Sequence, residues 1–180
     1  MELCISAIDF NNLHERLFRT APDECAAFLA TQTAGSRIVA RSVQVFDGQA
    51  FERSAHGELS LSEAAQVDAL ATLKRRGHGA VEVHTHPGSG THAAFSRFDL
   101  EQLPAFARYV RNKLPGHPYG ALVLGETGYE GIAITQSQET LMIRLVGEQS
   151  AIPGWLSSGP PPRRVRHRRM TGGSIVRSAR

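Results

Sequence analysis

Two histidines separated by a single residue, His84 and His86, end an apolar segment just before Pro87. Val81 and Val83 alternate with polar positions there, which is the pattern of a half-buried strand. Residues two apart on a strand face the same way, so the two imidazoles are expected to project side by side. Proline cannot donate a hydrogen bond to a neighbouring strand, and the strand is therefore predicted to stop at Pro87.

Another metal-ligand candidate follows a loop of small residues, in the sequence Ser-Arg-Phe-Asp at positions 96–99. Ser96 has the character of a helix N-cap, and Asp99 stands at the acidic position of a capping box. A helix from about residue 97 to residue 113 would hold Asp99 in its first turn. Two imidazoles and one carboxylate leave a fourth position for water, as in catalytic zinc sites. We therefore predict that His84, His86 and Asp99 bind Zn²⁺.

Simpler explanations exist for these side chains. A histidine pair on a strand is commonly an ordinary surface feature, and Asp99 could serve as a capping-box acid alone. A His-x-His pair followed by Ser-x-x-Asp is much rarer by chance, which favours the metal site. His92 lies in the intervening loop, where a fourth ligand would close the site, so we expect it to face the loop or a substrate.

These residues give the sequence its resemblance to the JAB/MPN metalloenzymes, whose JAMM motif combines an upstream Glu, His-[Ser/Thr]-His-Pro and Ser-x-x-Asp. Here the motif reads His-Thr-His-Pro at residues 84–87 and Ser-Arg-Phe-Asp at residues 96–99. Nine residues separate His86 from Ser96, more than in the family pattern, which predicts a longer loop over the site. The resemblance implies the MPN fold, a zinc cofactor and, for Ser96, donation to the oxyanion of a tetrahedral intermediate.

Hydrolysis at such a site also needs a carboxylate that moves protons without binding the metal. Glu82 lies on the same strand face as His84 but is too close in sequence to reach across the metal easily. Glu24 begins a separate apolar segment, and an acid at the head of a buried strand needs a reason because burying a charge is costly. The residues alone leave both acids open, whereas the resemblance implies that Glu24 is catalytic.

The order of strand and helix patterns predicts an α+β fold, with a mixed, largely antiparallel sheet flanked by helices. Strands are expected at residues 3–8, 24–31, 37–46, 81–86, 120–125, 129–135 and 141–146, with an irregular connection or short strand at 49–59. Asp9 or Asn11 is expected to cap a first helix, and Ser60 or Ser62 a second that ends at Gly77. Pro104 falls inside the third, where proline kinks or splits a helix.

We assign residues 1–147 to a JAB/MPN domain and residues 148–180 to a Pro/Arg-rich, disordered tail or linker. From residue 151 onward there are seven Arg, no Lys and no acid; removing these charges from the net +3 leaves about −4 on the body. A basic nucleic-acid surface is therefore not expected on the body. The favoured interpretation of the tail is a solvated, disordered segment. Contact with nucleic acid is less favoured, and a linker to a partner domain is the third alternative.

Neither the apolar segments nor the cysteines indicate a membrane or secreted protein. The sequence has no apolar run of 18 residues and no signal-peptide pattern. Its two cysteines, Cys4 and Cys25, do not make a disulfide scaffold. We expect a cytoplasmic location and no membrane partner.

The resemblance implies a zinc-dependent isopeptidase or peptidase that cuts an amide bond at the C-terminus of a ubiquitin-like protein. It also implies E1-like and E2-like partners. The alternative is an MPN scaffold that binds such partners without catalysis. All five functional residue types of the motif are present, which favours the enzyme.

Overall fold

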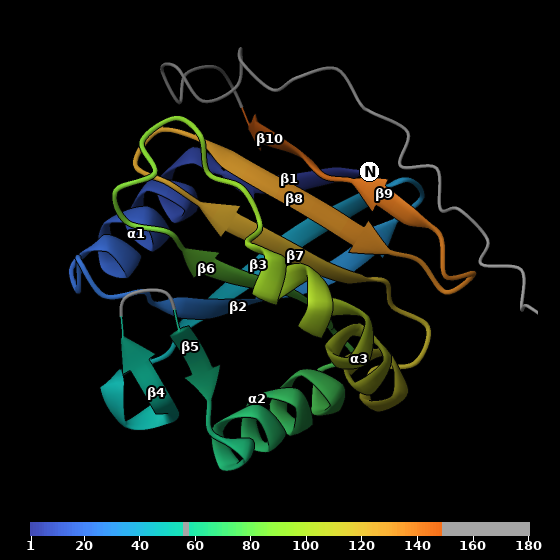
Figure 1. Cartoon of the computed structure of the whole chain (residues 1–180). Coiled ribbons are helices and arrows are strands. Elements are labelled where there is room, and N and C mark those ends of the chain that lie inside the picture. The colour runs from blue at the N-terminus through green and yellow to red at the C-terminus, as the bar shows by residue number, and fades with distance from the viewer. Residues whose placement is uncertain (56–57, 149–180) are drawn as a thin grey trace, which may run out of the picture.

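The computed structural model describes residues 1–55 and 58–148, in which helices cover both faces of a large curved sheet (Figure 1). In chain order the elements are β1 (Glu2–Ser6), α1 (Ala7–Phe18), β2 (Ala26–Ala34), β3 (Arg37–Val45), the 3-10 turn η1 (Gly48–Ala50), β4 (Phe51–Ala55), β5 (Glu58–Leu61), α2 (Glu63–Arg75), β6 (Gly79–Thr85), α3 (Arg97–Lys113), β7 (Tyr119–Leu124), β8 (Tyr129–Ile134), β9 (Thr140–Met142) and β10 (Arg144–Glu148).

The large sheet has eight strands in the order β10-β1-β3-β2-β6-β7-β8-β9. Strand β2 pairs antiparallel with β3 and β6, and β8 pairs antiparallel with β7 and β9. The pairs β1–β10, β1–β3 and β6–β7 are parallel. Strands β4 and β5 form a separate hairpin. The predicted α+β class and mixed, largely antiparallel sheet are thus confirmed.

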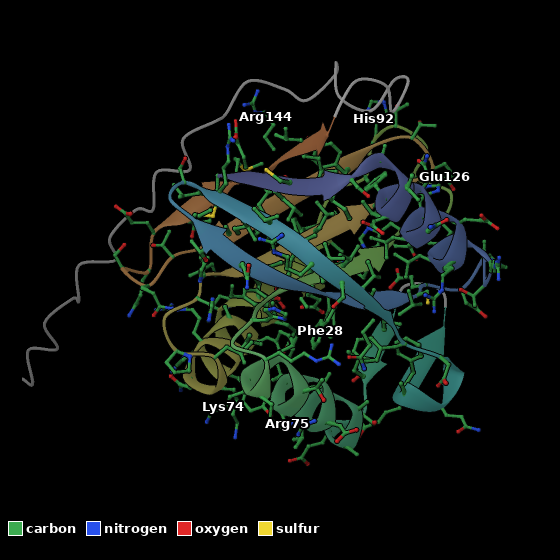
Figure 2. All side chains as sticks on the ribbon, turned by 180° about the vertical axis from the view of Figure 1, so that it is seen from behind. Phe28, Lys74, Arg75, His92, Glu126 and Arg144 are labelled. Carbon is green, nitrogen blue, oxygen red and sulfur yellow. The ribbon has the colours of Figure 1, made fainter. Side chains whose placement is uncertain are left out.

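Each face of the sheet has its own hydrophobic core. On one face, Leu13 and Leu17 of α1 pack with Val81, Val83 and residues from both edge regions of the sheet. On the other, α2 and α3 lie together against the sheet (Figure 1). Phe28 of β2 belongs to this second core (Figure 2). Because side chains alternate along β6, its valines enter the first core, and its even-numbered residues face α2 and α3.

The chain turns from β1 into α1 earlier than predicted. Ser6 is the N-cap: its side-chain oxygen accepts the backbone N–H of Asp9, whose carboxylate in turn accepts the Ser6 hydroxyl. The prediction of Asp9 or Asn11 as the cap was wrong because the strand ends at Ser6 instead of running to residue 8. The predicted cap Ser62 of α2 and cap Ser96 of α3 are confirmed.

Three further expectations need correction. The strand expected at 24–31 begins at Ala26. The segment expected at 141–146 forms two strands, because β9 pairs with β8 while β10 crosses to β1 at the other edge of the sheet. Of the two outcomes expected at Pro104, splitting of the helix is wrong, because α3 runs through Pro104 as one helix. This position is exposed, so water can satisfy the carbonyl that loses its partner.

The segment expected to be an irregular connection or a short strand, residues 49–59, includes β4 and the first residues of β5, so the short-strand alternative is confirmed. The Pro/Arg-rich tail lies outside the described residues, so the domain boundary at residue 147 stays a prediction. Within residues 1–55 and 58–148, no helix combines the length and hydrophobicity needed to cross a membrane.

Candidate metal centre

The end of β6 and the start of α3 bring three metal-ligand side chains together. One ligand atom from each of His84, His86 and Asp99 lies within 4.8 Å of the others. Asp99 Oδ2 is 3.6 Å from His84 Nε2 and 3.5 Å from His86 Nε2. His84 lies in β6 and His86 follows its last residue, and their ring centres are 5.0 Å apart, on the same side as the two-residue spacing predicted. The capping of α3 by Ser96 fixes the position of the carboxylate.

The burial and hydrogen bonding of His84 Nε2 show whether these residues suit a metal ion. This atom is buried and has no hydrogen-bond partner among the described residues. A buried polar atom without a partner carries a free-energy cost, which a bound cation would remove. Two imidazole nitrogens and a carboxylate oxygen converging on one point are the donor set of catalytic zinc. The residues therefore fit a zinc ion.

Asp99 serves two structural purposes with one carboxylate. Its Oδ2 accepts the Ser96 backbone N–H at 2.7 Å, while the Ser96 hydroxyl oxygen accepts the Asp99 N–H at 3.1 Å. The same Oδ2 faces both imidazoles. Burial opposes ionisation of Asp99, but its interactions with His84 and His86 outweigh burial and hold the pKa of Asp99 well below its usual value. The capping-box and ligand interpretations of Asp99 are therefore compatible.

Glu24 lies beside this cluster because of the pairing between β2 and β6. Ala26 is opposite His84, and continuing this antiparallel register places Glu24 opposite His86. Glu24 Oε1 is 3.8 Å from His86 Nε2. Fully buried Thr85 holds the intervening residue, since its Oγ1 accepts the backbone N–H of Cys25 at 2.9 Å. The Thr side chain between the two histidines thus fixes the segment that carries Glu24.

Glu82 is oriented differently from Glu24. It shares a strand face with His84, but its carboxylate accepts a hydrogen bond from the hydroxyl of Tyr119 on β7. Burial raises the pKa of Glu82, partly offset by His84 and Tyr119. Burial also raises the pKa of Tyr119 well above its usual value, and the neighbouring Glu82 adds to this effect.

A small cleft of about 250 Å³ exposes the candidate centre to solvent. Its lining includes Glu24, His86, Ser96 and Asp99. As the N-cap, Ser96 accepts a hydrogen bond through an oxygen lone pair, which leaves its O–H able to donate. Four of the five predicted site residues thus line this cleft, and the fifth, His84, is clustered with His86 and Asp99 beside it. Of these, His84 is the most deeply buried, with 7% of its surface exposed.

The long loop between His86 and Ser96 is fastened by two glutamates that the sequence analysis did not single out. Glu126, in the β7–β8 turn, accepts the backbone N–H groups of Gly88 and Gly90. Glu130 of β8 accepts the N–H of Phe95 at 2.9 Å. His92 is exposed on this loop, at the same end of the molecule as Glu126 (Figure 2). The only signal available in the sequence was the Glu-Thr-Gly turn itself.

Replacing Glu126 by Gln is expected to loosen this loop. An amide has one acceptor oxygen and no charge, so it cannot reproduce two bonds to backbone N–H groups. We expect a loss of about 1 kcal/mol in the free energy of unfolding, measured by urea denaturation, and faster amide exchange at Gly88 and Gly90. Glu139→Gln, on the exposed turn after β8, is the control and should change neither quantity. Unchanged exchange in Glu126→Gln would contradict this anchoring role.

The same bonds should make the loop sensitive to acid. The hydrogen bond from Gly88, with that from Gly90, lowers the pKa of Glu126. A carboxylate with a lowered folded-state pKa stabilises the fold above its unfolded pKa, and this contribution is lost as pH falls through the folded value. The protection of the Gly88 and Gly90 amides, taken as the ratio of intrinsic to observed exchange rate at each pH, is therefore expected to fall at acidic pH more in the wild type than in Glu126→Gln.

Sequence and structural comparisons identify the family and the fold of this chain. Residues 7–129, more than half of the chain, match the model of the family described as prokaryotic homologs of the JAB domain, and the chain belongs to this family. A solved structure with the same fold is the solution structure of protein DSY2949 from Desulfitobacterium hafniense. It shares 14% identity and a TM-score of 0.55, over 82% of this chain and 94% of that one. No curated protein matches the sequence.

Proposed function

We propose that this protein is a zinc-dependent isopeptidase or peptidase that cleaves an amide bond at the C-terminus of a ubiquitin-like protein. The convergence of His84, His86 and Asp99 beside Glu24 carries the proposal. A metal-binding triad alone would also suit a structural site. Hydrolysis needs, in addition to the metal ligands, a carboxylate that can move protons, and Glu24 lies next to the triad on its solvent-exposed side.

Each residue has a role in this proposal. His84, His86 and Asp99 would hold the zinc ion, which supplies Lewis acidity and lowers the pKa of water toward neutrality. Glu24 takes a proton from the attacking water at its carboxylate and returns it to the leaving amine. Ser96 donates a hydrogen bond from its hydroxyl to the oxygen of the substrate carbonyl as negative charge develops there, and keeps its proton. Thr85 keeps Glu24 in place through Cys25.

Membership of this family supports a proposal for the partners of the reaction. We propose that the substrate is a ubiquitin-like protein joined through its C-terminus to a lysine or a small group, and that E1-like and E2-like proteins make the conjugate. We place the reaction in the cytoplasm, in keeping with the two cysteines, which are free thiols in the structure.

The direct test is cleavage of a ubiquitin-like protein extended at its C-terminus by a peptide and a fluorophore. The zinc-loaded full chain is expected to release the extension. Removal of zinc with a chelator should abolish release, and added zinc should restore it. If the zinc-loaded chain binds the ubiquitin-like protein but never releases the extension, the scaffold function is correct and the hydrolase is wrong.

A further inference from the structure

A second, larger pocket adjoins the candidate metal centre on the side of α2 and α3. Its volume is about 530 Å³, within the range of small-ligand sites. Apolar side chains form its walls, among them Leu61 of β5 and Leu103 and Phe106 of α3. His84 and Asp99 also line it, so the pocket opens directly onto the candidate metal site. A substrate held at the metal would therefore have this pocket within reach.

The floor of the pocket is polar. Glu82 and Tyr119 line it, and the Tyr119 hydroxyl donates to one carboxylate oxygen of Glu82. In the part of the chain that the structure describes, this is the only hydrogen bond formed by the Glu82 side chain. The ring of Phe106 packs edge-on against Tyr119, with the ring centres 5.9 Å apart, and steadies the phenol. The Glu82 carboxylate is thus held in place, and its second oxygen can still accept a hydrogen bond.

The charges of the pocket have one sign. Three of its lining residues carry carboxylates, namely Glu63, Glu82 and Asp99, and none of the lining residues is Lys or Arg. A carboxylate in an apolar setting is costly unless a cation or further donors compensate it. The aliphatic stem of a basic side chain would pack against the apolar walls. Its cationic tip would donate charge-assisted hydrogen bonds to the Glu82 carboxylate at the bottom of the pocket.

We propose that this pocket binds a basic side chain, Lys or Arg, of the substrate next to the cleaved amide, and that Glu82 recognises its charged tip. Residues two apart on a strand are about 7 Å apart, so Glu82 lies roughly one extended basic side chain along β6 from His84. Glu82 is then a specificity-determining residue, in contrast to Glu24. Identifying the occupant as part of a substrate rests on the proposed hydrolase function.

Binding of small probes tests the pocket without requiring cleavage. n-Butylguanidinium and n-butylammonium imitate the two basic side chains, and N-butylurea is a neutral isostere of the former. Their binding to the full chain is measured by NMR through the methyl groups of Ala26 and Ala121, which line the pocket. We expect at least one cation to bind about tenfold more tightly than N-butylurea. Equal affinities in the wild type would overturn the proposal, and this comparison needs no variant.

Variants then assign the selectivity to Glu82. In Glu82→Gln the cation and N-butylurea should bind within about twofold of one another. Asp68→Asn, at an exposed position of α2 that is not among the residues lining the pocket, is the control and should keep the wild-type selectivity. Selectivity that survives in a folded Glu82→Gln variant would refute the assignment. If the protein prefers the cation but cleaves no substrate, the hydrolase proposal is refuted, whereas the proposal that the pocket binds a basic group still holds.

Discussion

Replacing Glu24 by Gln is expected to reduce kcat by about 10²–10⁴-fold while zinc remains bound. The amide keeps the size of the side chain but cannot take a proton from water and return it to the leaving amine. Glu24 lies 3.8 Å from His86 and is not one of the three clustered ligands, so the metal site should survive the change. The measurements are turnover of the fluorophore-labelled substrate and zinc content after dialysis.

Asp23→Asn is the matched control for this experiment. It removes the neighbouring carboxylate, which is exposed, and should leave both turnover and zinc content unchanged. If Glu24→Gln keeps wild-type turnover, another group moves the proton and the assignment of Glu24 is wrong. If it loses zinc, Glu24 belongs to the ligand set instead.

The second large effect concerns the ligand from α3. Asp99→Asn is expected to weaken zinc binding by more than the 10–100-fold that loss of an outer partner of a ligand typically costs. The asparagine oxygen can still accept the Ser96 N–H, so the capping box and the stability of the zinc-free protein should change little. Affinity is measured by competition with a chromophoric chelator, and stability by thermal unfolding in the presence of a chelator.

Glu101→Gln controls for the loss of an acid near the start of α3. Glu101 is exposed and pairs with Arg97 one turn away, an interaction worth little. Its replacement should leave zinc affinity unchanged. Wild-type zinc affinity in Asp99→Asn would mean that Asp99 serves only as the capping acid, the simpler explanation weighed for it above.

The sequence predicted the parts of the site that depend on local periodicity. A two-residue repeat placed His84 and His86 on one strand face, and a capping box placed Asp99 in the first turn of α3, because both patterns act over a few residues. The position of Glu24 needed the family resemblance. Its approach to His86 depends on pairing between β2 and β6, strands that are far apart in the chain.

The features that the sequence did not reveal are long-range. Glu126 holds a loop 36 residues earlier in the chain, and the Glu82–Tyr119 bond spans 37 residues. No local pattern distinguishes these acids from solvated ones. The misplaced cap of α1 has a different cause: Ser6, Asp9 and Asn11 are all good capping residues, and the end of β1 decides among them.

The central claim is that one zinc ion binds between β6 and α3. Anomalous diffraction at the zinc absorption edge, from crystals of the zinc-loaded full chain, tests it most directly. The claim predicts one strong peak about 2.0–2.2 Å from His84 Nε2, His86 Nε2 and a carboxylate oxygen of Asp99. No peak at this position, or a peak bound by other residues, would contradict it.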